Sequence, residues 1–337
     1  MVRELFYTAA LLVPGLAYAG NPSADLSVQI VPAVPQVPAG AQAAGFTTLA
    51  ANYDFSQPKY ASQSNYLTCG VLSSNAGSVT TDFWQEVDGN GLSTMPCDIN
   101  QITDTGPNGD GSTVLELGWQ PGYTGGGLPG LQTMHTRTIF PINSYVEIMG
   151  RVQDTPDITT DPYEDPGNYS LVWAWNSPGF EPDINENFGP SNWPSGGVGQ
   201  GNANTAATMH QWPSQAAVVL SQAHFDVRQY HKFGLRLTGN SSDGGTQAFC
   251  MDYDGVRTNC ATLGIPTGAS AIRYNWQVTD GAICNSGTSK HGGGTGFGDF
   301  SCVVSRRIAY RVKYIRIWSC SSWQTGICDT GPITSNP

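Results

Sequence analysis

The distribution of apolar residues along the chain predicts strands rather than helices. Residues 233–238 and residues 311–318 alternate polar and apolar positions, as strands with one buried face do. Residues 145–152 are rich in β-forming side chains, and residues 169–175 form a nearly continuous apolar stretch, typical of a strand buried on both faces. Asp254-Gly255 lies between two further β-rich stretches and predicts a hairpin. With glycine-rich turns and no convincing amphipathic helix, the pattern predicts an all-β fold, a β-sandwich jelly roll.

Composition supports this fold and restricts the partners. The chain has 337 residues, of which 12% are charged, with 41 glycines and 22 prolines, so tight turns are favoured over long helices. The formal net charge of −11 argues against nucleic acid, whose phosphates require a surface rich in lysine and arginine. Strongly anionic substrates are also disfavoured, although a local basic groove could still bind them. A neutral polysaccharide fits this balance better.

The first residues have the features of an export signal. Arg3 is followed by an apolar run from Leu5 to Leu16, and Ala17-Tyr18-Ala19 is a small-x-small cleavage site. We therefore expect a signal peptide at 1–19, cleavage near Ala19 and a secreted or periplasmic protein. The run is too short to span a membrane, and no other stretch is long enough, so no membrane contact is expected.

The remaining chain reads as one large domain. Residues 20–45 are rich in alanine, proline and valine, which predicts an extended leader or linker. The β-jelly-roll domain is expected at 46–330, followed by a short tail at 331–337. We expect this domain to be monomeric.

Eight cysteines fit an exported protein, because an even number in an oxidising compartment indicates disulfides. Eight cysteines allow 105 pairings, and their order along the chain favours neighbouring pairs. The expected pairs are Cys69–Cys97, Cys250–Cys260, Cys284–Cys302 and Cys320–Cys328.

No cofactor is expected to be required. The spacing of cysteines and histidines disfavours a zinc site. A second group of acids, at Asp157, Asp161, Glu164 and Asp165, lies among prolines and lacks the ligand pattern of an EF-hand, so a loop is favoured there. A structural calcium ion elsewhere in the sandwich is possible.

Three acids within six residues are the candidate catalytic groups. On a regular strand Glu181 and Asp183 share a face, whereas Glu186 points away from it. One extra residue, a β-bulge at Ile184-Asn185, would return Glu186 to the first face and turn Ile184 toward the packed side. Retaining glycoside hydrolysis needs a carboxylate nucleophile and a carboxylic acid about 5–5.5 Å apart, which neighbouring strand positions can approach.

The segment E-P-D-I-N-E resembles the E-x-D-x-x-E signature of family 16 glycoside hydrolases, in its bulged, laminarinase-like form. That resemblance implies a concanavalin A-like jelly roll, with Glu181 as nucleophile, Asp183 as its assistant and Glu186 as acid/base. Flanking segments resemble family segments in the same order over about residues 46–319, among them Tyr145-Val-Glu147, Tyr169 to Trp173, Thr208-Met-His210-Gln-Trp212, Tyr230 to Leu235, Met251 to Gly255 and Lys313 to Trp318.

Aromatic residues near the acids are candidates for substrate binding, because tryptophan faces stack on sugar rings. Most tryptophans nevertheless belong to cores, as Trp318 is expected to do. Proximity in sequence favours Trp173, Trp175 and Trp212, with Trp193 as a weaker candidate in a Gly/Pro-rich loop. His210 is expected to hydrogen-bond the nucleophile or a sugar hydroxyl, whereas His231, at a strand start, is expected to be structural.

The sequence favours a secreted, endo-acting, retaining glycoside hydrolase. The resemblance implies a β-1,3- or mixed-linkage β-glucan as substrate, with galactans of the agar or carrageenan type as the alternative. A second hypothesis is a carbohydrate-binding, lectin-like protein without activity, because Pro182 removes a hydrogen-bond donor from what should be a central strand. A polysaccharide lyase is the third hypothesis, and it lacks a recognisable set of basic residues.

Overall fold

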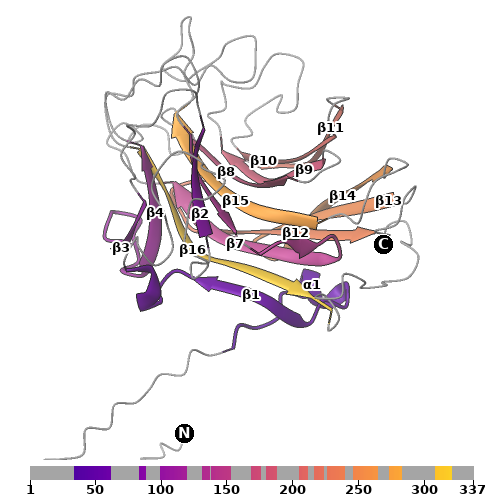
Figure 1. Cartoon of the computed structure of the whole chain (residues 1–337), viewed down its shortest axis with the longest axis horizontal. Coiled ribbons are helices and arrows are strands. Elements are labelled where there is room, and N and C mark those ends of the chain that lie inside the picture. The colour runs from indigo at the N-terminus through magenta and orange to yellow at the C-terminus, as the bar shows by residue number, and fades with distance from the viewer. Residues whose placement is uncertain are drawn as a thin grey trace, which may run out of the picture. The chain divides into compact units, whose positions relative to one another are not determined.

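The computed structural model describes residues 34–61, 83–88, 99–119, 131–136, 138–152, 168–175, 180–187, 205–211, 216–223, 226–239, 246–264, 273–282 and 308–320. The chain divides into two compact units, Met1–Gln36 and Val37–Pro337. The described residues of the first unit, 34–36, lie in neither helix nor strand. The second unit contains two antiparallel eight-stranded sheets, so the predicted all-β jelly roll is confirmed (Figure 1).

The first sheet has the strand order β14-β13-β12-β7-β16-β4-β3, and β1 pairs with the end of β16 beyond β4. Its strands are β1 (Thr48–Asp54), β3 (Ile99–Thr103), β4 (Thr113–Trp119), β7 (Ser144–Val152), β12 (His231–Gly239), β13 (Thr246–Tyr253), β14 (Val256–Gly264) and β16 (Ile308–Ser319).

The second sheet has the order β11-β10-β9-β8-β15-β5-β2, and β6 pairs with the start of β15. Its strands are β2 (Phe83–Asp88), β5 (Leu131–Thr136), β6 (Phe140–Pro141), β8 (Asn168–Trp175), β9 (Phe180–Asn187), β10 (Thr205–Gln211), β11 (Ala216–Ala223) and β15 (Arg273–Ala282). The acids of the predicted signature lie on β9, the third strand counted from the β11 edge.

Each strand predicted from sequence lies within a strand of the structure. The predicted hairpin is also confirmed, because β13 and β14 pair across Asp254 and Gly255. Both turn residues have positive φ, 49° and 82°, the conformation that a two-residue Asp-Gly hairpin turn requires.

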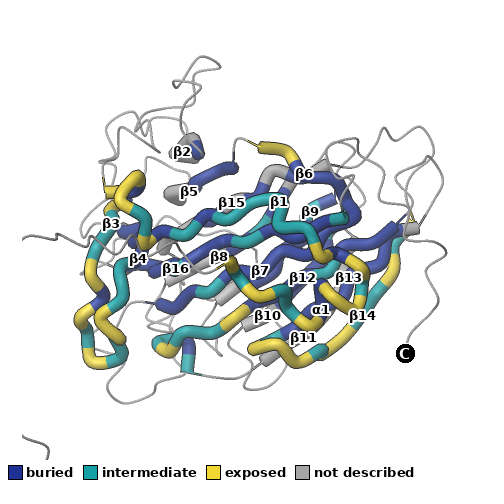
Figure 2. The backbone as a smooth tube through the Cα atoms, turned by 90° about the horizontal axis from the view of Figure 1, so that it is seen from below, coloured by how far each residue is buried: buried dark blue, intermediate teal, exposed yellow. Residues whose placement is uncertain are grey.

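The core lies between the two sheets. Buried side chains from both sheets form one continuous cluster, which includes Val146, Ile148, Ile184, Trp276 and Ile315. Figure 2 shows the buried positions along the central strands, whereas much of β14 is exposed. Strand β8 departs from its predicted burial on both faces: Val172 and Ala174 are buried in the core, but Trp173 is partly exposed.

The segment before β1 is not wholly the extended leader expected for residues 20–45. Ala39–Ala43 forms the short helix α1, whose Ala41 packs with Phe46, Tyr145 and Trp318 in a second, smaller core. Ala-Gly-rich sequence carries no periodic apolar pattern, so the helix depends on this tertiary contact. Trp318 is a core residue, as predicted. Among the described residues no helix has the length and apolar character needed to cross a membrane.

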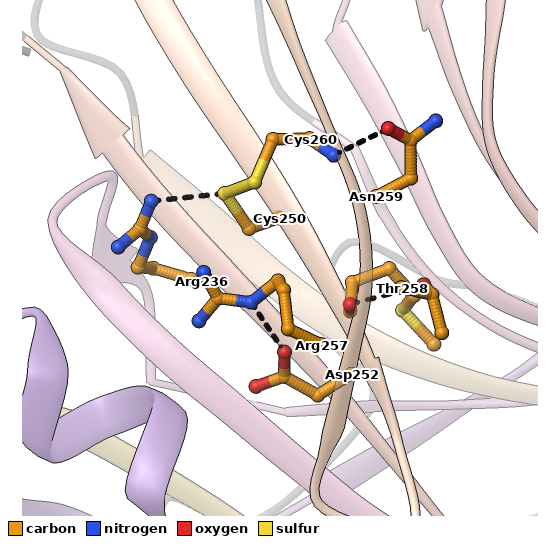
Figure 3. The surroundings of a disulfide bond; sticks show 8 residues. Arg236, Cys250, Asp252, Arg257, Thr258, Asn259 and Cys260 are labelled. Carbon is orange, nitrogen blue, oxygen red and sulfur yellow. Dashed lines mark hydrogen bonds and ion pairs between the residues drawn. A yellow bond between two sulfur atoms is a disulfide. The ribbon is translucent and has the colours of Figure 1, made fainter. Parts of the chain in front are cut away.

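One predicted disulfide is confirmed: Cys250 and Cys260 pair directly across β13 and β14 (Figure 3). It ties the outermost strand of the first sheet to its neighbour. Cys320 is also disulfide-bonded. The other cysteines of the predicted pairs, Cys69, Cys97, Cys284, Cys302 and Cys328, lie outside the described residues.

Close packing over Gly234 gives a test of the first sheet. A Cβ at this position would overlap the Tyr145 hydroxyl, which donates a hydrogen bond to Asp252 at 2.9 Å. Gly234→Ala should therefore lower the free energy of unfolding by about 1–3 kcal/mol, measured by urea denaturation. Gly264→Ala is the matched control, because no atom lies within 4 Å of its added Cβ. Equal stabilities of the two variants would contradict the close packing.

Candidate active site

Strand β9 carries apolar and acidic residues on opposite faces. Phe180, Pro182 and Ile184 are buried, and the first and last of them belong to the core. Glu181 and Asp183 alternate with them and so point away from the core. Glu181 is partly exposed, whereas Asp183 is only 2% exposed.

The predicted bulge is confirmed by the register on both sides of β9. On β8, Leu171 pairs with Glu186 and Trp173 with Asp183, so two steps on β8 match three on β9. On β10, Ala206 pairs with Glu186 and Thr208 with Asp183, again two steps against three. The extra residue returns the backbone at position 186 to the phase of position 183, as the sequence predicted.

Both residues of the bulge are turned into the sandwich. Ile184 and Asn185 are each 0% exposed, and Ile184 packs in the main core. Asn185 Nδ2 donates a hydrogen bond to the hydroxyl of Tyr310, on β16 of the opposite sheet, at 3.0 Å. This contact satisfies a buried amide that would otherwise be costly, since an unpaired buried polar group costs about 1–3 kcal/mol.

Pro182 lies where the ladder between β8 and β9 ends. The last described pair of that ladder joins Trp173 to Asp183, the residue that follows Pro182 in the chain. On the other side Pro182 still pairs with Met209 of β10. The strand thus accommodates the missing backbone donor at the end of one ladder, where a proline is least disruptive.

Register shifts lie side by side across four strands of the second sheet. They fall at Val172/Trp173 on β8, at Ala206/Thr208 of the β9–β10 pair and at Ala207/Thr208 of the β10–β11 pair. Because a bulge bends its strand and increases the local twist, a row of them bends the sheet along one line. Asp183 lies beside this line, and it points away from the core together with Glu181.

Neighbouring strands add aromatic and polar residues to the same face. Trp173 on β8 and Thr208 on β10 lie directly opposite Asp183, and His210 lies opposite Glu181. Directly opposed residues share a face of the sheet. His210 Nε2 lies 3.1 Å from Asp183 Oδ2, so the ring contacts the middle acid of the signature. Three strands thus assemble the site.

Burial raises the pKa of Asp183 well above its usual range, and the charge of Glu181 raises it further. Both effects favour the protonated form of Asp183. Asp104 shows the contrast: burial raises its pKa too, but hydrogen bonds from Arg151 and Tyr230 outweigh burial and lower it. Asp104 pairs with Arg151 and Arg311, whereas Asp183 lies beside His210 and the negative charge of Glu181.

Thr208 is a residue of the site that sequence reasoning did not single out. It is 3% exposed, and its Oγ1 and Asp183 Oδ1 are both buried without a hydrogen-bond partner among the described residues. The two residues are directly opposed on neighbouring strands, so two unsatisfied polar side chains lie next to each other in the site. Thr208 and Asp183 are 25 residues apart in the sequence, so only the register between β10 and β9 brings them together.

The other predicted site residues have different outcomes. For Glu186 and Trp175 the backbone is described, within β9 and β8. Trp193, Trp212 and the acids at 157–165 lie outside the described residues. His231 is structural, as predicted, since its two ring nitrogens contact Asp254 Oδ2 at 2.8 Å and the Asp226 carbonyl at 3.2 Å. In the described part of the chain no group of three or more His, Cys, Asp or Glu residues could hold a metal ion.

Fold and site define a β-sandwich protein with a carboxylate-bearing strand face. Comparison of the sequence with protein-family models and with curated proteins finds no match. The structure is similar to a β-1,3-glucanase from Mycobacterium marinum, with 15% identity, 80% of this chain and 99% of that chain covered, and a TM-score of 0.43. It is also similar to LamAcat from Zobellia galactanivorans, with 14% identity, 81% and 98% covered, and a TM-score of 0.45.

A third similar structure is a GH16 protein of a mixed-linkage glucan locus from Bacteroides ovatus. Its identity is 15%, with 70% of this chain and 94% of that chain covered and a TM-score of 0.43. These likenesses concern the arrangement of strands and identify no residue of this chain as catalytic.

The raised pKa of Asp183 predicts that replacing its carboxyl group by an amide changes the pH dependence of stability. The folded protein holds this proton more tightly than the unfolded chain, so wild-type stability falls as pH rises above the unfolded value near 4. Asp183→Asn cannot lose stability in this way. Its free energy of unfolding should therefore rise relative to that of the wild type by up to about 1.4 kcal/mol per pH unit above pH ~4. Urea denaturation across pH 3–7 measures the difference.

Asp110→Asn is the control with the opposite sign. Its contact with Lys313 lowers the pKa of Asp110 to about 2, so this carboxylate stabilises the folded protein above pH ~4. The variant should lose stability there and match the wild type below pH ~2. If Asp183→Asn followed the same direction as Asp110→Asn, the raised pKa of Asp183 would be wrong.

Proposed function

We propose that this protein is a secreted glycoside hydrolase that cleaves a β-linked polysaccharide internally and retains the anomeric configuration. The observation that carries the proposal is the bulge of β9, which brings positions 181, 183 and 186 into one phase at the bend of the sheet. A pair of carboxyl groups on one face, at short spacing, is what retaining hydrolysis requires.

In the proposed reaction the Glu181 carboxylate attacks the anomeric carbon. Its partial exposure leaves it accessible to a sugar, and burial raises the pKa of its neighbour Asp183, which favours the protonated form. A neutral Asp183 leaves the negative charge on Glu181, where a nucleophile needs it. The sequence resemblance supports the same assignment.

Asp183 and His210 then respond to the change of charge on Glu181. When Glu181 forms its bond to the sugar, it loses the charge that helps to keep the Asp183 proton in place. His210, 3.1 Å away, can take up that proton and return it when the intermediate is hydrolysed. Asp183 thus acts as a proton-holding neighbour of the nucleophile.

Glu186 is the proposed general acid and base. It protonates the leaving oxygen in the first step and activates water in the second, so its carboxyl must lie on the face of Glu181. The register of β9 with both neighbouring strands supports this phase. No metal or cofactor takes part in the proposed steps.

Trp173 is the proposed platform for a sugar ring, because it is partly exposed and directly opposite Asp183. Trp175, Trp212 and Trp193 are proposed as further platforms from their positions in the sequence. A β-1,3- or mixed-linkage glucan is the proposed substrate, from the sequence resemblance, with galactans as the alternative.

The assignment predicts that Glu181→Gln and Glu186→Gln each lower hydrolysis by at least about 10²–10⁴-fold while leaving the fold intact. The measurement is the release of reducing ends from a panel of β-glucans and galactans, with thermal unfolding as the check of folding. Each amide keeps the size of the acid but can neither attack nor transfer the proton.

Glu147→Gln is the matched control on the opposite sheet. Burial raises the pKa of Glu147, and Tyr314 donates a hydrogen bond to its Oε1 at 2.9 Å, a bond that a glutamine oxygen can also accept. This variant should retain full activity. Full activity of either site variant would remove that residue from the mechanism.

A carbohydrate-binding protein without activity is the second candidate, motivated by Pro182, which lies between Glu181 and Asp183 and has no backbone N–H to donate. It predicts that the wild type binds a polysaccharide of the panel but releases no reducing ends from any of them. Affinity electrophoresis on the same panel separates the two functions.

A further inference from the structure

The bulge of β9 places a polar side chain, Asn185, in the core of the sandwich. Without the extra residue, position 185 would take the outward phase and position 186 would turn into the core. The register of the structure instead buries Asn185 and returns position 186 outward. A polar side chain in an apolar core therefore has to be satisfied in the bulged register.

Tyr310 supplies that partner from the opposite sheet. Its hydroxyl accepts the hydrogen bond of Asn185 Nδ2 at 3.0 Å, and both residues are 0% exposed. In a low-dielectric interior such a bond is strong, and leaving either group unpaired is costly.

Gly150 fixes where the hydroxyl lies. Tyr310 is directly opposite Val152 on β7, and the hydroxyl end of its ring lies beside Gly150. A Cβ at Gly150 would overlap the hydroxyl oxygen of Tyr310 and approach its Cζ at 2.7 Å. The glycine thus leaves the space in which the hydroxyl can reach Asn185.

We infer that Tyr310 is a positioning residue for catalysis, which holds the bulge of β9 through Asn185 and so sets the phase of Glu186 relative to Glu181. The inference rests on the proposed function for its catalytic meaning. Tyr310 lies in the other layer of the sandwich and faces the core, so it acts on the reaction only through β9.

Tyr310→Phe tests this role, because it removes one hydroxyl and keeps the ring. It should lower kcat by roughly ten- to a hundredfold with KM little changed, since misplacement of about 1 Å can cost that much. Backbone amides at 184–186 should also exchange with solvent at least about tenfold faster.

Tyr274→Phe is the matched control. Tyr274 is also 0% exposed, and its hydroxyl donates a hydrogen bond to Gln247 Oε1 at 2.9 Å, away from the bulge. It should lose similar stability yet keep kcat and the exchange at 184–186. If the two variants behave alike in both measurements, the inference is overturned.

The double variant Asn185→Leu with Tyr310→Phe separates stability from position. Replacing both partners by apolar side chains should recover much of the lost stability, since neither is left unpaired. The reduced kcat should persist, and full recovery of kcat would overturn the inference. If the wild type cleaves no polysaccharide, the proposed function fails, and the exchange comparison of Tyr310→Phe with Tyr274→Phe alone decides whether Tyr310 holds the bulge.

Discussion

One inserted residue in β9 governs the candidate site. The strand must bury Ile184 and Asn185 in the sandwich and still return position 186 to the face of Asp183, and only a bulge satisfies both demands. The same irregularity continues into the pairs of β10 with β9 and β11, so it also bends the sheet where the acids lie. Core packing and site geometry are thus two results of one register shift.

Local patterns were enough to predict the features that depend on local sequence. Alternating stretches predicted the strands, Asp254-Gly255 predicted the hairpin, and the neighbouring order of Cys250 and Cys260 predicted their disulfide. The bulge was predictable as well, because three acids at spacings of two and three residues can share a face only if one extra residue intervenes. Its catalytic meaning came from the resemblance of the sequence to a known signature and stays a prediction.

Contacts between distant segments were not predictable. Asn185 and Tyr310 are separated by 125 residues, and no local pattern links them. Thr208 became a site residue only through the register that sets it opposite Asp183. Helix α1 was missed because its Ala-Gly-rich sequence has no apolar period and is helical through packing on the first sheet.

Stereochemistry of the product reports most directly on the central claim, because the separation of the two carboxyl groups decides between retention and inversion. The bulge places positions 181 and 186 in one phase on one strand, and the proposed mechanism requires their carboxyl groups to lie at the short separation of a retaining site. The decisive measurement follows the anomeric proton of newly released reducing ends by NMR, before mutarotation. We expect the β-anomer to appear first. Initial release of the α-anomer from a β-linked glucan would contradict it.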